Sequence, residues 1–447
     1  MENFKYITES NADYPNLVGE QQLPLFSYER NRKITANDKR MLSLFSGCGG
    51  MDLGFEGGFS CHRASVGNND WIDYSINDNW IVLKTNQFRT IFANDILKEA
   101  RTAWLNYMHR FEVDPDIYHT DSIVDLVKSH QKGIKVFPDD IDIVTGGFPC
   151  QDFSIAGKRK GFDSKMNHDG RKRQAEAPSE ETRGKLYFWM KQVIDITKPK
   201  MFIAENVKGL VSLGDVKRII QEDFASAAED GYIVLDPQVL HAGDYGVPET
   251  RERVIFIGIR KNALNEKALK ELSKDCVSEE YNPYPIATHH FTTTSKGRLK
   301  PVSCRMVLGE LKEPENSMDM SQRFYSKAKF MGSHCQGQTE INLDGLGPTI
   351  RSEHHGNIEF RRLSAEHGGK ITDELQKGLS ERRLTPRECA MIQTFPPDYP
   401  FVKMKNYTKH FELNASGAYK VIGNAVPPIL AYNIARRIQS VWSLYFK

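Results

Sequence analysis

The chain has 447 residues, of which 39% are hydrophobic and 26% are charged, so it is long enough to form more than one domain. Its 60 Lys and Arg residues nearly balance 58 Asp and Glu residues, and a net charge of +2 does not by itself indicate a polyanionic partner. The sequence has no apolar run near the roughly 18 residues of a membrane span, no signal-like N-terminal stretch, and no Cys-x-x-Cys pair among its seven cysteines. These features predict a cytoplasmic globular protein without membrane contact, disulfide framework or bound metal.

Short apolar runs rich in β-branched residues alternate with segments of helical periodicity over the first part of the chain. This alternation predicts a Rossmann-like, doubly wound α/β sheet whose strands are mostly parallel. We expect a hairpin of 232–240 and 254–259 to make the far end antiparallel, which gives a mixed sheet, and we interpret 60–88 as a loop insertion. The expected strands are 41–45, 90–94, 141–146, 201–205, 232–240 and 254–259, and the expected helices are 98–110, 185–197 and 216–231.

The pattern breaks after residue 262, where the sequence becomes polar and rich in His, Thr, Ser, Gly and Lys. We expect only short strand-like pieces there, at 347–352 and 357–363. The C-terminal stretch predicts a helix that begins at a proline pair and packs back on the first domain through Ile429, Leu430, Ile434 and Ile438. The predicted parts are an N-terminal arm (1–38), an α/β domain (39–262), a smaller irregular domain (263–400) and a returning segment (401–447).

A glycine-rich turn, FSGCGG at 45–50, follows the first predicted strand. Gly47, Gly49 and Gly50 allow a tight turn into a helix that a ligand can approach closely, although such a turn can also be purely structural. The second strand ends at Asp95, whose carboxylate can accept hydrogen bonds from both hydroxyls of a ribose. Asp121 follows a third strand and could add a contact on the nucleobase side. An acid at either position can equally be a helix cap.

Cys150 follows a proline at the end of the fourth predicted strand, before a loop rich in Ser, Gly, Lys and Arg. Open α/β sheets bind ligands at the carboxyl ends of their strands. The proline restricts the backbone, and nearby cations favour the reactive thiolate. We interpret Cys150 as a nucleophile, although a lone cysteine can also be a small core residue.

Glu205, in the run AENV, ends the next strand and is expected at the same edge as the cysteine. Arg251 and Arg253 stand two residues apart at the start of a strand, which predicts that both face the same way. Two guanidinium groups on one face can hold ring oxygens or phosphates. The alternative is that they form salt bridges with Glu249 and Glu252.

The runs FSGCGG, PCQ, ENV, Arg-x-Arg, Thr-Pro-Arg-Glu and GNAVPP occur in this order. Together they resemble the DNA (cytosine-5)-methyltransferase family of the bacterial restriction–modification type. The resemblance implies that Cys150 attacks C6 of a flipped-out cytosine, that Glu205 contacts the N3 and N4 edge, that Arg253 contacts the base carbonyl, and that Arg251 steadies the intermediate. It also implies S-adenosylmethionine as the cofactor and no metal. The implied cofactor-binding residues are Phe45, Ser46, Gly47, Gly49, Gly50, Asp95, Ile96, Asp121, Ser122, Asn424 and Ala425.

The resemblance further implies double-stranded DNA as the partner, a target-recognition role for 263–400, a monomeric enzyme and a nucleoid location. A cognate restriction endonuclease would act on the same sequence without direct contact. One departure is Glu249, where the family usually has glutamine, and this puts the packing role of that position in doubt. Three other functions are weighed: RNA cytosine methylation by the same chemistry, an inactive DNA-binding regulator, and a nicotinamide-dependent dehydrogenase. A dehydrogenase would not explain the runs PCQ and ENV.

Overall fold

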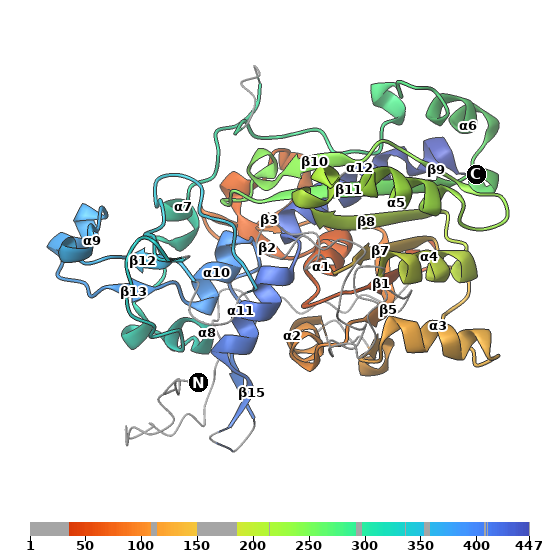
Figure 1. Ribbon diagram of the computed structural model, residues 1–447. Coiled ribbons are helices and arrows are strands. Elements are labelled where there is room, and N and C mark those ends of the chain that lie inside the picture. Colours follow the sequence, from red (N-terminus) through yellow and green to blue (C-terminus); the bar gives the residue numbers. More distant parts are fainter. Residues whose placement is uncertain are drawn as a thin grey trace.

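A central mixed sheet organises the first part of the molecule (Figure 1). The computed structural model describes residues 35–108, 114–149, 186–213, 215–291, 297–335, 337–352, 358–405, 408 and 410–446. The strand order is β10-β11-β8-β7-β1-β5-β6, and β9 also pairs with β11. Strand β11 is antiparallel to its neighbours, whereas β6, β5, β1, β7 and β8 are parallel. The strands are β1 (Lys39–Leu44), β5 (Phe88–Asn94), β6 (Tyr118–His119), β7 (Ile143–Gly147), β8 (Met201–Val207), β9 (Tyr232–Val234), β10 (Gln238–His241) and β11 (Glu252–Arg260).

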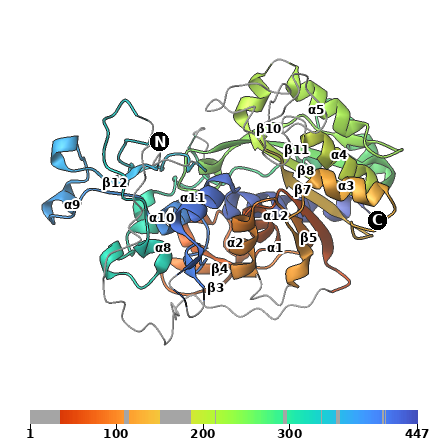
Figure 2. The ribbon, with the colours of Figure 1, turned by 60° about the horizontal axis from the view of Figure 1, so that its bottom comes forward.

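Successive residues of these strands point to opposite faces, and each face carries its own core. Met41 and Met201 belong to one cluster of buried residues, whereas Leu42 and Phe202 belong to the other. Helices α1 (Gly50–Glu56), α2 (Lys98–Met108) and α12 (Pro428–Tyr445) cover the first face. Helices α3 (Ile123–Gln131), α4 (Leu186–Thr197) and α5 (Val216–Ala225) cover the second (Figure 2). The predicted doubly wound α/β sheet is confirmed.

Two local predictions need correction. The expected strand 232–240 is divided into β9 and β10, because Pro237 between them has no N–H to donate to β11. The expected loop 60–88 instead contains a small antiparallel sheet of β2 (Ser60–His62), β4 (Trp80–Leu83) and β3 (Ile72–Ser75). Strand β4 is buried along its whole length, and Trp71 contacts Tyr432 of α12. The apolar run WIVL therefore forms a strand despite its polar surroundings.

The second part of the chain is built from short elements joined by irregular segments (Figure 1). Helix α10 packs against α7, α8 and α11, and the expected strand-like piece 357–363 contains β12. The piece 347–352 forms no strand, and its Gly347 makes only an isolated bridge to Glu249. The elements are α6 (Glu266–Leu272), α7 (Cys304–Leu308), α8 (Met320–Arg323), β12 (Phe360–Arg362), α9 (Thr372–Gln376), β13 (Arg382–Arg383), α10 (Pro386–Ile392), β14 (Lys403–Met404), β15 (Phe411–Leu413) and α11 (Ala415–Asn424).

Helix α12 returns the C-terminus to the sheet, as the sequence predicts. It begins at Pro428 and packs on α1 so closely that a Cβ on Gly54 would lie 2.4 Å from the Cβ of Ala431. Helix α6 also packs on α12, although it lies in the range expected for the second domain. Among the described residues, no helix has the length and apolar character needed to cross a membrane.

Candidate active site at the carboxyl edge of the sheet

The turn after β1 carries unusual backbone conformations. Phe45 has a φ of 52°, a region that non-glycine residues seldom adopt, and Gly47 and Gly49 also have positive φ. A Cβ would meet nothing within 4 Å at Gly47, whereas at Gly49 it would lie 2.6 Å from the Trp104 ring and at Gly50 2.2 Å from the carbonyl oxygen of Val426. Gly47 is therefore the open position of the turn, while Gly49 and Gly50 are buried and allow close packing beneath it.

Asp95 links the ends of β5 and β1. Its carboxylate accepts hydrogen bonds from the backbone N–H of Gly47 (3.1 Å) and of Leu97 (2.9 Å). Burial raises the pKa of Asp95 to about 6. The neighbouring Ile96 side chain is 44% exposed, which leaves an apolar surface beside a carboxylate. This combination can bind a nucleoside, whose ribose is polar and whose base is flat.

The third predicted cofactor position lies where β6 ends. Ser122, not Asp121, caps helix α3, because its hydroxyl accepts the Val124 N–H at 3.3 Å. Asp121 is exposed, and its backbone carbonyl accepts a hydrogen bond from Asn94 at 2.8 Å. Asn94 also binds the carbonyl of His119, so it fixes the ends of β5 and β6 relative to one another.

Asn424 and Ala425 approach the same turn from the end of α11. Asn424 is exposed, whereas Ala425 is buried and lies against Gly50. The Cys48 thiol donates to the Val421 carbonyl at 3.3 Å, which holds the turn against α11. The fold thus brings together two motifs from opposite ends of the sequence.

Glu205 and Arg253 form an ion pair on adjacent strands, with Glu205 Oε1 and Arg253 Nε 2.7 Å apart. The side chains of Glu205 and Arg253 are only 10% and 13% exposed. Burial raises the pKa of Glu205, although the positive charges of Arg253 and Arg251 oppose that shift. A buried carboxyl with a raised pKa can donate a proton nearer to neutral pH than an ordinary glutamate.

Two further residues lie around this pair: Asn206, which belongs to the ENV run, and Gly147, which was not singled out from the sequence. Gly147 stands opposite Glu205 in the parallel pairing of β7 and β8, and a Cβ there would lie 2.7 Å from Glu205 Oε2. Asn206 is buried and donates to the Phe148 carbonyl at 3.0 Å. It thereby fixes the chain just before the Pro149–Cys150 dipeptide. Only the strand register could have indicated Gly147.

Cys150 and the loop that follows it to residue 185 lie outside the described residues. The described chain ends at Pro149 on this side, two residues beyond Gly147. The nucleophile role of Cys150 therefore stays a prediction from the sequence.

Arg251 is fully buried and is bound by backbone carbonyls. Its guanidinium donates to the backbone carbonyls of Ile350 (2.9 Å), Gly423 (2.9 Å) and Ala425 (2.8 Å). Arg251 thus joins the start of β11 to the 350 segment and the end of α11. The positive charges of both arginines act on Glu205, but only Arg253 forms an ion pair with it. The expectation that both side chains face the same way stays a prediction.

Glu249 takes part in the same junction. Its Oε1 accepts the Ile350 N–H at 2.6 Å and lies 3.5 Å from Nη1 of Arg251, and burial raises the pKa of its carboxyl. The glutamate therefore packs the 350 segment against β11. The expected salt-bridge alternative applies to Arg251, whereas Arg253 pairs with Glu205 and Glu252 pairs with Lys208.

The chain is similar in sequence and in fold to several known methyltransferases. The family model "C-5 cytosine-specific DNA methylase" matches residues 39–440. The type II methyltransferase M.BsuRI of Bacillus subtilis is 30% identical over 91% of this chain and 80% of its own length. M.BspRI of Lysinibacillus sphaericus is 31% identical over 91% of this chain and 83% of its own. The crystal structure of the S. pombe Dnmt2 methyltransferase matches 90% of this chain and 98% of its own, with a TM-score of 0.50 and 16% identity, which shows a shared fold.

Proposed function

This chain belongs to the C-5 cytosine-specific DNA methylases, and from that premise we propose that it methylates C5 of a flipped-out cytosine within a specific short sequence of double-stranded DNA. The observation that carries the proposal is the buried Glu205–Arg253 pair at the carboxyl edge of the sheet. It lies over Gly147, three residues before the cysteine of the PCQ run. A base must leave the duplex stack before side chains in such a site can reach it.

The residues at the ends of β1, β5 and β6 fit S-adenosylmethionine. Gly47 has open space around it, Asp95 presents a carboxylate, and Ile96 exposes an apolar side chain. We propose that the turn at Phe45–Gly47 and Asn424 hold the amino-acid end, Asp95 the ribose, and Ile96 with Asp121 and Ser122 the adenine. When bound, the cofactor supplies an electrophilic methyl group. No step of the proposed chemistry requires a metal ion.

Cys150 would make the ring reactive. Its thiolate forms a bond to C6, the electron pair of the 5,6 double bond moves towards C4 and N3, and N3 takes up a proton. The product is an enamine that is nucleophilic at C5. After C5 has gained the methyl group, loss of the C5 proton, departure of the thiolate and return of the N3 proton to Glu205 restore the neutral aromatic ring. Water can accept that proton, because the mechanism requires no particular side chain as the base.

Glu205 would supply the N3 proton, since burial raises the pKa of its carboxyl and so favours the protonated form. Arg253 holds that carboxyl in place with Nε, and its remaining N–H groups can donate to the base carbonyl. Asn206 would fix the approach of the cysteine through the Phe148 carbonyl. Arg251 would act through the scaffold, by holding the carbonyls at the end of α11.

A duplex carrying 5-fluorocytosine tests the covalent step, because fluorine cannot leave C5 as a proton does. We expect a protein–DNA adduct that forms only with S-adenosylmethionine present and survives denaturing electrophoresis. Cys150→Ala should form none, whereas the control Cys335→Ser should form as much as the wild type. An adduct in the Cys150→Ala variant would contradict the assignment.

The finer biological setting is also a proposal. We propose that the enzyme works as a monomer on nucleoid DNA and shares its recognition sequence with a restriction endonuclease that it does not contact. The type II names of its relatives support this setting. The inactive-regulator alternative is disfavoured because Glu205 and Arg253 form a complete pair. Light scattering on the purified protein, with and without duplex, would measure its oligomeric state.

A further inference from the structure

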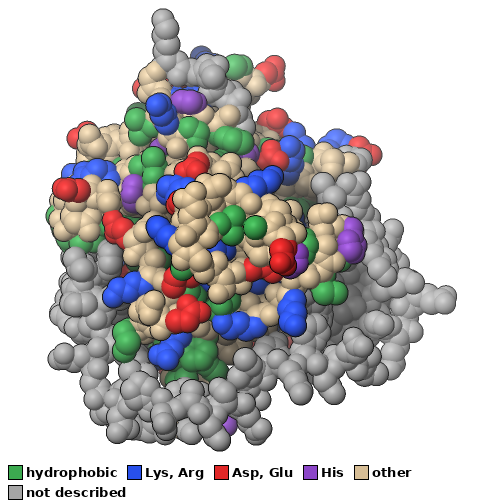
Figure 3. Space-filling model, turned by 90° about the vertical axis from the view of Figure 1, so that its left-hand side faces the viewer, with side chains coloured by type: hydrophobic (Ala, Val, Ile, Leu, Met, Phe, Trp, Pro, Cys, Tyr) green, Lys and Arg blue, Asp and Glu red, His purple; other side chains and the backbone are tan. Residues whose placement is uncertain are grey.

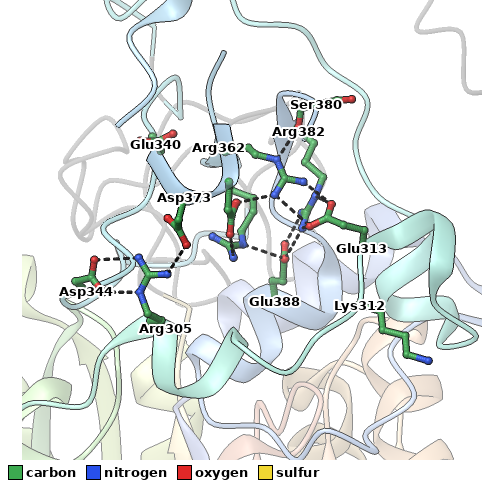
Figure 4. A network of polar contacts seen from close by, with 12 residues as sticks. Arg305, Lys312, Glu313, Glu340, Asp344, Arg362, Asp373, Ser380, Arg382 and Glu388 are labelled. Atoms are coloured by element: carbon green, nitrogen blue, oxygen red, sulfur yellow. Dashed lines mark hydrogen bonds and ion pairs between the residues drawn. The ribbon is translucent and has the colours of Figure 1, made fainter. Parts of the chain in front are cut away.

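Several arginines are buried where β12, β13 and α10 meet, and most of them contact carboxylates (Figure 4). Arg362 and Arg382 share the carboxylate of Glu313, and Arg382 also binds Glu388 at 2.8 Å. Arg361 contacts Glu374 and Glu388, and Arg387 binds Asp319. These pairs compensate for the loss of hydration that burial imposes on each guanidinium.

Arg383 is the exception in this cluster. It is 1% exposed, and in the part of the chain that the structure describes no carboxylate lies within ion-pair distance of its guanidinium. Nε donates to the Ala328 carbonyl at 3.3 Å, and Nη1 donates to the carbonyls of Gly337 (2.5 Å) and Ile358. The guanidinium also lies 4.0 Å from the centre of the Phe360 ring. Burial lowers the pKa of Arg383 to about 10, so its side chain is held at an electrostatic cost.

Of the carbonyls that Arg383 binds, that of Ala328 lies within one segment, residues 325–335, and that of Gly337 lies two residues beyond it. Further contacts hold this segment: the Phe330 ring stacks on His367 at 4.5 Å, and the Met331 N–H donates to Gln338. No helix or strand forms there, yet side chains at alternate positions, including Lys327, Lys329 and Met331, are exposed. The segment is therefore irregular, with a turn at Gly332–Cys335, and these contacts hold it against the rest of the second part of the chain.

The charge of this segment is one-sided. Residues 320–339 include Arg323, Lys327 and Lys329 and no Asp or Glu. Figure 3 shows basic and acidic side chains mixed over this end of the molecule, so the excess is local. The Lys327 ammonium lies 3.6 Å from the centre of the Tyr325 ring, and neither lysine forms an ion pair with another described residue. Exposed lysines without a carboxylate partner are the kind of side chain that neutralises the phosphates of a duplex.

We propose that residues 325–335 lie against the phosphate backbone of the target duplex through Lys327 and Lys329, and that Arg383 is the positioning residue that fixes their course. The inference rests on the proposed function, since it takes duplex DNA as the substrate. It deepens that function by naming a contact surface in the second part of the chain.

The test measures binding of a labelled mixed-sequence duplex at several salt concentrations. Each lost phosphate contact lowers the slope of log K against log salt by about 0.9. Lys327→Ala with Lys329→Ala should therefore lower the slope by about 1.8 and leave binding of S-adenosylmethionine unchanged. The control pairs Lys132→Ala with Lys270→Ala, which removes the same charge from exposed positions on the sheet domain and should leave the slope as in the wild type.

Arg383→Lys keeps the charge but cannot reach three carbonyls with one ammonium. We expect a higher KM for DNA with kcat nearly unchanged at saturating duplex, and a salt slope between those of the wild type and the double-lysine variant. If Arg383→Lys does not fold, the double-lysine variant still decides, because its changes are at exposed positions. An unchanged slope in that variant would overturn the inference while wild-type DNA methylation stands. A wild type that binds no duplex would instead overturn the proposed function.

Discussion

Replacing Gly147 by alanine should disturb the catalytic carboxyl without disturbing the strand. A Cβ at this position would lie 2.7 Å from Glu205 Oε2, whereas ordinary contact begins near 3.4 Å, so the carboxyl must move by 3.4 − 2.7 = 0.7 Å. A displacement of about 1 Å in a catalytic group can cost about 100-fold in rate. We therefore expect Gly147→Ala to lower single-turnover methyl transfer by about 10- to 100-fold.

The neighbouring residue provides a control. A Cβ at Gly146 would meet the thioether of Met190 at 3.0 Å, and this flexible side chain can move aside. Gly146→Ala should therefore retain most of the activity.

A double-mutant cycle with Glu205→Asp separates the steric cause from others. The aspartate side chain is shorter and leaves room for the new methyl group. In that background Gly147→Ala should cost less than about three-fold. An equal loss in both backgrounds, or wild-type activity of Gly147→Ala alone, would show that displacement of the Glu205 carboxyl is not the cause.

Cys150→Ala should abolish methyl transfer while cofactor and DNA binding persist, and turnover near the wild-type rate would remove the nucleophile assignment. Arg251→Met should lower the free energy of unfolding by about 3–5 kcal/mol, because buried carbonyls and Glu249 lose their donor. Denaturant titration measures this free energy, with the exposed Arg218→Met as the control. A loss as small as that of the control would contradict the prediction. Arg362 and Arg382 hold the pKa of Glu313 down to about 2 despite its burial. The stability that the ionised Glu313 contributes is therefore complete above about pH 4.5 and declines as the pH falls towards 2. Glu313→Gln should be less stable than the wild type by about 2 kcal/mol at pH 7, and an equal difference at pH 2 would show that the ion pairs are not the cause.

The sheet could be predicted because its strands are buried on both faces and read as continuous apolar runs. The small sheet 60–88 could not, since Asn and Asp surround a single buried run, WIVL, and its partner strands carry a weaker pattern. A local pattern also does not show that Pro237 divides a strand. Each of these features depends on which segment lies opposite in space.

Part of the candidate site was predictable, because a polar residue at the end of a buried parallel strand is expected at the carboxyl edge of the sheet. Glu205 was expected at the edge with the cysteine, and its contact with Arg253 follows from the pairing of β8 with β11. The carbonyl partners of Arg251 were not predictable, because they come from residues 350 and 423–425, which are distant in the sequence. The same holds for Gly147, whose role is visible only in the register with Glu205.

Methyl transfer from labelled S-adenosylmethionine to mixed-sequence duplex DNA tests the central claim most directly, with tRNA in parallel and bisulfite sequencing of the product. We expect label in DNA alone, at C5 of cytosine within one short recurring sequence. Label in tRNA alone, or no label in either while the cofactor binds, would contradict it.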